Sequence, residues 1–237
     1  MKIYENYLKR VMDFILSLIA IIIFSPLLVI LSLIGLVAMK GNPFFCQPRP
    51  GKIDKKTGNE KIFKLIKFRT MSNEKDKDGN LLPDNVRLNS YGKFLRSTSL
   101  DELPSLINIL NGDLSIVGPR PQLVRDMVFM NPVQRERHSV RPGLTGLAQV
   151  NGRNNITWEQ KFEYDLIYIK DISFINDIKI ILQTIGKVLK RSDVVREGTV
   201  SDMDFGDWLL QNKKITIYEY NKIMKDFLDE RKIDERK

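Results

Sequence analysis

The sequence predicts an α+β protein in which an apolar helical segment precedes a mainly helical domain with a small β-hairpin. The run from Phe14 to Met39 carries no charge and is long enough for a membrane helix. Two strand-like segments between Phe44 and Met71 flank a polar turn, and helical patterns separated by turn signals follow. We therefore place a membrane anchor at 1–40, a central domain at 41–200 and a peripheral helical tail at 201–237.

Composition narrows the classes of function. The chain has 237 residues, enough for one sizeable core plus an anchor. It has a single cysteine, Cys46, and a single histidine, His138, which excludes an intrachain disulfide and a Cys/His zinc site. The net charge of +9 indicates an anionic partner. Because no helix-turn-helix, zinc-finger or aromatic RNA-binding signature is present, we expect lipid and phosphate rather than nucleic acid.

The apolar run contains Ser25-Pro26 near its middle, and a proline there kinks or breaks a helix. Basic residues flank the run on both sides: Lys2, Lys9 and Arg10 before it, and Lys40, Arg49 and Lys52 after it. Positive flanks favour the cytoplasmic side, so a helix that enters one leaflet and returns would suit both. A kinked spanning helix is the alternative, and the residues alone leave both open. Either arrangement places the domain after Lys40 in the cytoplasm.

The rest of the chain is read as a hairpin, a loop and a series of helices. The hairpin spans 44–71, with Gly58 in its turn, and the loop covers 73–85. Helical patterns follow near 89–97, 100–110, 122–130, 157–170, 175–191 and 207–235. The last pattern carries an apolar stripe formed by Tyr220, Ile223, Met224 and Phe227. This stripe could pack on the domain or on a second chain, which leaves a homodimer open.

An acidic pair, Asp101 and Glu102, opens the helical pattern near 100–110. At 100° per residue Asp101 points away from the apolar face and Glu102 lies on its flank, and Ser99 followed by Glu102 matches a capping box. One interpretation is structural, because acidic residues are favoured at a helix N-terminus. The other is catalytic, because an ionised and oriented carboxylate can attack phosphorus.

Four basic residues lie in short segments around this pair: Lys67, Arg69, Arg96 and Arg120. Arginine suits phosphate because its planar fork donates two parallel hydrogen bonds. The segment from Arg141 to Arg153 adds a cation at each end and glycines that allow close approach to a ligand, but it is not a P-loop. Each feature alone fits a solvated surface, whereas together they favour a phosphate site.

Asp165 lies on the apolar stripe of the helix predicted at 157–170. A carboxylate on a core face must be paired, hydrogen-bonded or bound to a metal. A structural ion pair, for instance with an arginine, and a place in the functional site are both consistent with this position.

The motifs KFRTM, LRSTSLDELPSLINILNGDLSIVGPRP and RPGLTGLAQVNGRN resemble the bacterial sugar transferase family, the monotopic phosphoglycosyl transferases. The similarity extends from about Lys9 to Thr199. It implies a re-entrant anchor broken at Ser25-Pro26 on the cytoplasmic face of the bacterial inner membrane. It also implies transfer of a sugar-1-phosphate from a UDP-sugar to polyprenol (undecaprenyl) phosphate, with release of UMP, as the first membrane step of a glycan pathway.

The resemblance further implies roles for residues of this chain. Asp101 would be the nucleophile that forms a phospho-sugar-aspartyl intermediate, and Glu102 would assist through metal binding or proton handling. Mg²⁺ would be held by Asp101, Glu102 and Asp165. The predicted substrate- and phosphate-binding residues are Lys67, Arg69, Arg96, Arg120, Arg141 and Arg153.

Three other functions remain open from the sequence. A tethered binding protein would not need Asp101 for its function, and an ordinary glycosyltransferase would release UDP instead of UMP. A basic membrane-surface protein that binds nucleic acid is the least favoured. The sequence identifies neither the sugar nor the pathway.

Overall fold

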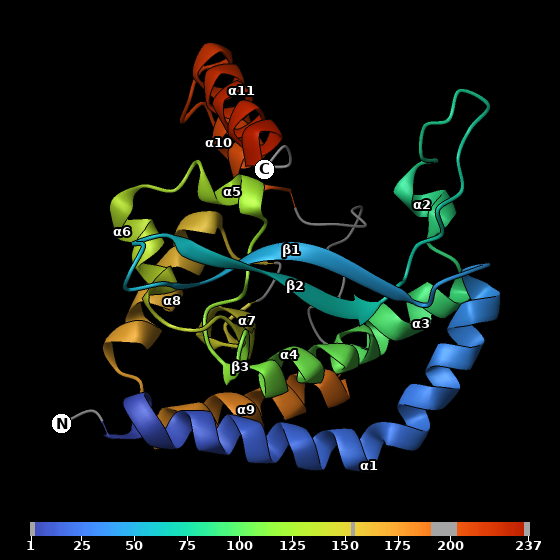
Figure 1. Cartoon of the computed structure of the whole chain (residues 1–237), viewed down its shortest axis with the longest axis vertical. Helices are drawn as coiled ribbons and strands as arrows, with labels where there is room; N and C mark the ends of the chain where they lie inside the picture. The colour runs from blue at the N-terminus through green and yellow to red at the C-terminus, as the bar shows by residue number, and fades with distance from the viewer. Residues whose placement is uncertain (1–2, 153–154, 191–202, 235–237) are drawn as a thin grey trace.

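The computed structural model describes residues 3–152, 155–190 and 203–234. A long helix, α1 (Lys9–Ala38), runs along one side of the molecule, with α4 (Leu106–Asn111) and α9 (Phe174–Lys190) beside it (Figure 1). A hairpin of β1 (Phe44–Ile53) and β2 (Glu60–Phe68) crosses the middle, and the C-terminal helices lie beyond it on the opposite side (Figure 1). This arrangement confirms the predicted mixture of a long apolar helix, a mainly helical domain and a small hairpin.

The helix α1 follows a π-helical turn, Tyr4–Leu8, and remains one continuous helix through Pro26, where we expected a break. It nevertheless bends part-way along its length (Figure 1). Pro26 has no N–H to offer the carbonyl of Ile22, and the Ser25 hydroxyl donates to that carbonyl at 2.8 Å instead. At the Ser-Pro pair the carbonyl of Ile22 therefore keeps a hydrogen-bond partner. The whole helix, Tyr4–Ala38, is long and apolar enough to cross a membrane.

Polar contacts fix the start of α1 to the domain. Asp13 is buried, and its carboxylate accepts hydrogen bonds from the Ser115 hydroxyl at 2.7 Å and the Ile116 N–H at 3.0 Å. The Arg10 guanidinium donates to two carbonyls at the C-terminal end of α4, at 2.5 and 2.7 Å. A cation at this position satisfies carbonyls that have no partner within the helix.

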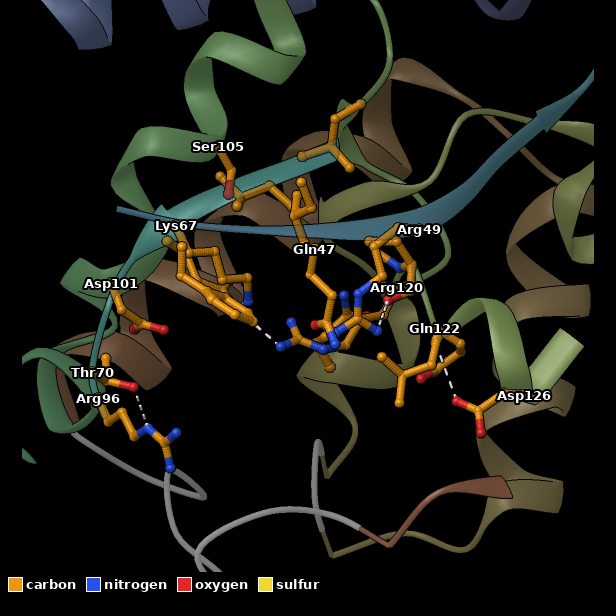
Figure 2. Close-up of a pocket in the computed structure, with 18 of the residues that line it drawn as sticks. Gln47, Arg49, Lys67, Thr70, Arg96, Asp101, Ser105, Arg120, Gln122 and Asp126 are labelled. Carbon is orange, nitrogen blue, oxygen red and sulfur yellow. Dashed lines mark hydrogen bonds and ion pairs between the residues drawn. The ribbon is translucent and has the colours of Figure 1, made fainter. Parts of the chain in front are cut away.

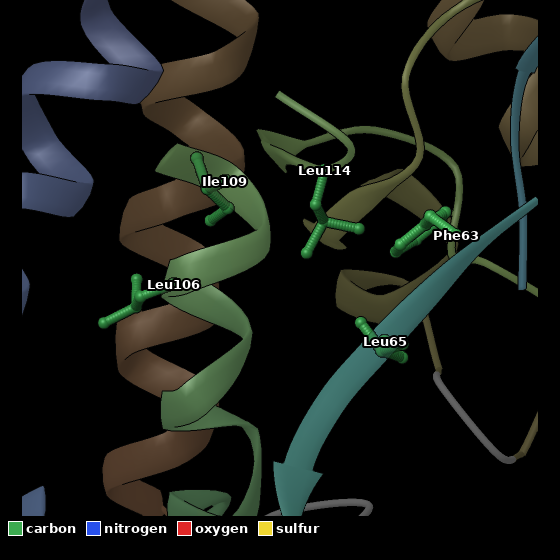
Figure 3. Packing of buried hydrophobic residues seen from close by; sticks show 5 residues of the cluster. All are labelled: Phe63, Leu65, Leu106, Ile109 and Leu114. Atoms are coloured by element: carbon green, nitrogen blue, oxygen red, sulfur yellow. The ribbon is translucent and has the colours of Figure 1, made fainter. Parts of the chain in front are cut away.

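The hairpin has the register expected from its alternating pattern, with Phe44 opposite Phe68 and an irregularity between Pro50 and Ile53. Gly58 in its turn has φ 71°, a conformation that favours glycine. One face of β2 packs on the helices beneath it and forms a hydrophobic core of Phe63, Leu65, Leu106, Ile109 and Leu114 (Figure 3). This core holds the hairpin against α4 and so fixes the strand that carries Lys67.

The remaining elements range from single turns to the 18-residue helix α11. They are α2 (Asp84–Arg87), α3 (Ser90–Thr98), the 3-10 turns Leu100–Ser105 and Glu136–Ser139, β3 (Ser115–Val117), α5 (Val124–Met127), α6 (Pro132–Arg135), β4 (Gly143–Thr145), α7 (Leu147–Val150), α8 (Trp158–Lys170), α10 (Phe205–Gln211) and α11 (Ile217–Asp234). The helix predicted at 122–130 is only one turn long, and the helix predicted at 100–110 starts with a 3-10 turn. The parallel pair of β3 and β4 was not expected.

Glu60, at the start of β2, contributes to the stability of the fold, and this contribution is lost at acid pH. Its buried carboxylate accepts from Arg135 at 2.9 and 2.5 Å and contacts Nδ1 of His138 at 2.9 Å. Burial raises its pKa, but the hydrogen bonds from His138 and Arg135 outweigh this and lower the pKa from 4.5 to about 2. Because the folded-state pKa is the lower one, Glu60 stabilises the fold above pH 4.5, and this contribution is lost as pH falls from 4.5 to 2.

We therefore expect the unfolding free energy of Glu60→Gln to fall less between pH 5 and pH 3 than that of the wild type. By linkage, each unit of pKa difference between the folded and unfolded states corresponds to about 1.4 kcal/mol. The measurement is urea unfolding in detergent across this range. Glu136→Gln is the matched control, because Glu136 is exposed. If the unfolding free energy of Glu60→Gln fell as steeply between pH 5 and pH 3 as that of the wild type, Glu60 would not be the source of the acid sensitivity.

Candidate active site

A cavity of about 500 Å³ lies between one face of the hairpin, the 3-10 turn 100–105, α7, α8 and the start of the tail. Its volume suits a small-molecule ligand. Charged and polar side chains project into it from several elements (Figure 2). It brings together the following residues that the sequence predicted: Lys67, Arg69, Arg96, Asp101, Glu102, Arg120 and Asp165.

The acidic pair sits on a sharp local turn. Ser99 ends α3 with φ 57°, in the left-handed region, and the chain then enters the 3-10 turn Leu100–Ser105. The expected capping box is wrong, because the Ser99 side chain makes no cap hydrogen bond at this turn. The Glu102 carboxylate is directed instead toward two cations. The turn consequently presents both Asp101 and Glu102 to the cavity.

Glu102 organises the cations next to Asp101. One of its oxygens, Oε1, accepts from Lys67 Nζ at 2.7 Å and from Arg120 at 2.9 Å. Burial lowers the pKa of Lys67, while the charge of Glu102 acts in the opposite direction. Two cations with one carboxylate between them leave positive charge for an anionic ligand, which is the electrostatic requirement of a phosphate site.

Arg96 is fixed at the other side of the acidic pair. Its Nε donates to the Thr70 hydroxyl at 3.0 Å, and Figure 2 shows Thr70, Arg96 and Asp101 grouped together at one end of the labelled residues. Burial lowers the pKa of Arg96, and the nearby Asp101 charge partly restores it. Arg69, from the same strand end as Thr70, donates to the Phe44 carbonyl at 3.3 Å.

Sequence reasoning missed Gln47 and Arg49, which also line the cavity. Arg49 donates to the Pro121 carbonyl at 3.2 Å and to Gln47 Oε1 at 2.7 Å. Burial, with the Arg120 charge, lowers the pKa of Arg49 to about 10. Both residues share a strand face with Phe45, which pairs with Lys67 across the hairpin. Tracing the period-two pattern from Lys67 onto the partner strand would have identified them.

Asp165 is paired with an arginine, which was the structural alternative considered for it. Its Oδ2 accepts from Arg137 Nε at 2.9 Å and lies 2.6 Å from Arg137 Nη2, and both side chains are almost fully buried. Burial raises the pKa of Asp165, and the charge of Arg137 opposes this. In the part of the chain that the structure describes, no three His, Cys, Asp or Glu residues are grouped to hold a metal. Arg137 thus engages one oxygen of Asp165, and the metal role of Asp101, Glu102 and Asp165 stays a prediction.

Two further arginines were predicted to bind phosphate, Arg141 and Arg153. Arg141 lines a second cavity of about 160 Å³ near the start of α1, and its Nε donates to the Gly112 carbonyl at 2.8 Å. This contact ties the loop after α4 to the segment before β4. Arg153 lies outside the described residues.

The tail contributes to the cavity wall, so it is not wholly peripheral. Met203 and Asp204 line the cavity, and Trp158 Nε1 donates to the Met203 carbonyl at 3.1 Å. Phe205 is buried against Trp158, and its N–H donates to Asp126 at 2.8 Å. The predicted apolar stripe on α11 also packs on its own chain, where Tyr220 stacks on the Phe129 ring.

A family model described as bacterial sugar transferase matches residues 4–191, from the turn before α1 to just beyond α9. The chain belongs to the bacterial sugar transferase family. The predicted family is thereby confirmed, and the chain is a transferase enzyme. The tail lies beyond the stretch that this sugar transferase shares with the family model.

Curated relatives agree with this membership. This sugar transferase is 48% identical over 184 residues to the uncharacterized sugar transferase EpsL of Bacillus subtilis. The aligned stretch covers 77% of this chain and 87% of the relative. It is 40% identical over 189 residues to a UDP-glucose:undecaprenyl-phosphate glucose-1-phosphate transferase of Klebsiella pneumoniae, covering 76% of this chain. It is 34% identical over 194 residues to an N-acetylgalactosaminephosphotransferase of Aeromonas hydrophila, covering 77% of this chain. The matches span 39% and 44% of these last two relatives.

Proposed function

We propose that this sugar transferase moves a sugar-1-phosphate from a UDP-sugar to undecaprenyl phosphate and releases UMP, with Asp101 as the covalent nucleophile. The observation that carries the proposal is the cavity in which Asp101 lies beside Glu102, Lys67 and Arg120. The relatives support the substrates, because one is named as using UDP-glucose and undecaprenyl phosphate.

The reaction would take place in two displacements at phosphorus. An Asp101 carboxylate oxygen attacks the β-phosphorus of the donor, and the bond from that phosphorus to the bridging oxygen breaks. UMP leaves with the bonding electrons, and the sugar phosphate remains on Asp101 as an acyl phosphate. An oxygen of the lipid phosphate then attacks the same phosphorus and expels the carboxylate, which gives the lipid diphosphate sugar.

The cations of the cavity would stabilise the charge that develops in both steps. Lys67 and Arg120 are held by Glu102, and Arg49 lies near Arg120, so the pyrophosphate of the donor would meet cations that are already positioned. Mg²⁺ fits the adjacent carboxylates of Asp101 and Glu102, because this ion is typically held by one or two carboxylates together with substrate phosphates. When bound, it would supply further charge neutralisation at the pyrophosphate.

The described surface supports attachment to a membrane. The helix α1 exposes many large apolar side chains, and α9 beside it exposes Phe174, Ile175, Leu182 and Leu189. The mixture of an apolar face and a charged remainder on α9 is typical of a helix lying in the membrane interface. We infer a re-entrant α1 that bends at Pro26 and returns to the cytoplasmic face, so that the cavity lies close to the phosphate of a membrane-embedded lipid.

The re-entrant arrangement predicts that both ends of α1 are cytoplasmic. In intact cells, cysteines introduced at Lys2 and Lys40 should resist a membrane-impermeant maleimide and react only after the cells are lysed. The variants are made in a Cys46→Ser background, because Cys46 is exposed. Labelling of the Lys2 position in intact cells would mean that α1 spans the membrane.

The experiment that tests the proposed reaction identifies the released nucleotide. The purified full-length protein in nanodiscs is supplied with Mg²⁺, undecaprenyl phosphate and a panel of UDP-sugars. Release of UMP, together with a phospho-sugar adduct detected by intact mass without the lipid acceptor, is the expected result. Release of UDP would identify an ordinary glycosyltransferase, and folded protein that releases neither nucleotide would indicate a binding protein.

A further inference from the structure

The wall of the cavity formed by α7, α8 and the tail is not used by the proposed chemistry at Asp101. Its apolar lining comes from Leu144, Ala148, Trp158 and Met203. The Trp158 ring is held in place because its Nε1 donates to the Met203 carbonyl and because it packs on Phe205. Gln149, Lys161, Asp165 and Asp204 from the same elements line it too, so an apolar surface meets a few polar groups here. This combination suits a flat ligand group with one polar edge.

Two buried side chains in this wall have polar atoms with no partner among the described residues. Gln149 is 9% exposed, and both its Nε2 and its Oε1 lack a hydrogen bond. Asp165 is 2% exposed, and Arg137 bonds only its Oδ2, which leaves Oδ1 without a partner. A buried polar group without a partner is costly, so such atoms at a cavity wall indicate that a ligand completes them.

The Gln149 amide lies close to the backbone at Gly146. A Cβ added to Gly146 would lie 2.8 Å from Gln149 Oε1 and 2.1 Å from the Gly118 carbonyl oxygen. Glycine at this position therefore gives the amide room to lie against the start of α7. The amide offers one donor and one acceptor side by side, which matches a ligand edge with an N–H next to a carbonyl.

We propose that Gln149 and Asp165 bind the polar edge of the uracil base of the nucleotide donor, and that Trp158 belongs to the apolar wall beside the ring. This inference rests on the proposed function for the identity of the donor. Uracil has two flat apolar faces and one edge on which N3–H lies between two carbonyls. Gln149 Nε2 would donate to a uracil carbonyl, and Gln149 Oε1 or Asp165 Oδ1 would accept from N3–H. A sugar would instead need polar partners around its whole ring.

The test measures binding without turnover, so that it is independent of the proposed reaction. The affinities of the full-length protein in detergent are determined by calorimetry for UMP, 3-methyl-UMP and ribose 5-phosphate. Methylation removes N3–H, and ribose 5-phosphate lacks the base. The variant is Gln149→Met, which keeps the side-chain length without its polar atoms. Gln211→Met, at an exposed position at the end of α10, is the matched control.

We expect the wild type and Gln211→Met to bind 3-methyl-UMP at least about tenfold more weakly than UMP, since a site built to hydrogen-bond a group rejects a ligand that lacks it. Gln149→Met should bind UMP about tenfold more weakly, lose most of the penalty for methylation and keep the wild-type affinity for ribose 5-phosphate. Equal binding of UMP and 3-methyl-UMP by the wild type would overturn the inference even if the variant fails to fold.

Two further results would also overturn it. One is a Gln149→Met protein that keeps the full penalty for methylation, and the other is an equal loss of affinity for UMP and ribose 5-phosphate. Release of UDP in the turnover experiment, combined with the expected methylation penalty, would refute the proposed reaction but leave the base site standing. UMP release that requires Asp101, combined with equal binding of UMP and 3-methyl-UMP, would support the proposed reaction and refute the base site.

Discussion

Asp101→Asn should lower the rate of UMP release by at least about 10⁴-fold, because an amide cannot replace a carboxylate as the nucleophile. The effect should appear in the turnover rate at saturating donor, measured as initial rates of UMP formation. The phospho-sugar adduct should be absent from the intact mass of the variant. The fold should be unaffected, because the substitution changes the charge of a side chain at a partly exposed turn and leaves its size almost unchanged.

Asp113→Asn is the matched control for this prediction. Asp113 pairs with the exposed Lys61 and does not line the cavity, so the control should keep a rate close to that of the wild type. If Asp101→Asn retained a tenth of the wild-type rate or more, the covalent mechanism would be wrong and Asp101 would be only a helix-terminal acid.

Arg137→Met should lower the free energy of unfolding by about 3–5 kcal/mol, which is typical of removing one partner of a buried ion pair. Arg137 is 1% exposed and Asp165 2%, so the substitution leaves a buried carboxylate without its cation. Arg137 also donates to the Arg120 carbonyl at 2.7 Å, and its loss removes that contact as well. Urea unfolding in detergent at neutral pH measures the change.

The double variant Arg137→Met with Asp165→Asn separates charge from packing. We expect it to be more stable than Arg137→Met alone, because it removes the uncompensated charge. Equal stability of the single and double variants would mean that the loss comes from packing and from the Arg120 contact, and not from the buried charge of Asp165.

Local patterns predicted the parts of the fold that depend on neighbours in sequence. The hairpin followed from its alternating residues and polar turn, and the apolar run predicted the long helix. The pair of β3 and β4 was missed because each strand has three residues, too few for a periodic signal. The continuity of α1 was missed because Pro26 normally removes a hydrogen bond, and the compensating contact from Ser25 depends on a side-chain rotamer.

The candidate site was predicted by residue type more than by geometry. Asp101 and Glu102 were identified because they are adjacent, but the pairing of Glu102 with Lys67 depends on how β2 packs on the turn after α3. That packing joins residues far apart in sequence and has no local signature. Asp165 was correctly expected to need a partner, and only the fold could show that Arg137 provides it.

The contacts at the start of α1 have a consequence for how the cavity is held relative to the bilayer. Arg10 and Asp13 bond to α4 and to β3, and further along α1 the Leu31 carbonyl accepts from the Tyr91 hydroxyl at 2.8 Å. Rotation of α1 about its own axis would break these bonds. The membrane segment and the transferase domain should therefore tilt together as one rigid unit. Exchanging α1 for an unrelated membrane helix would alter the depth and orientation at which the cavity meets the proposed lipid acceptor, even if the cavity itself were unchanged.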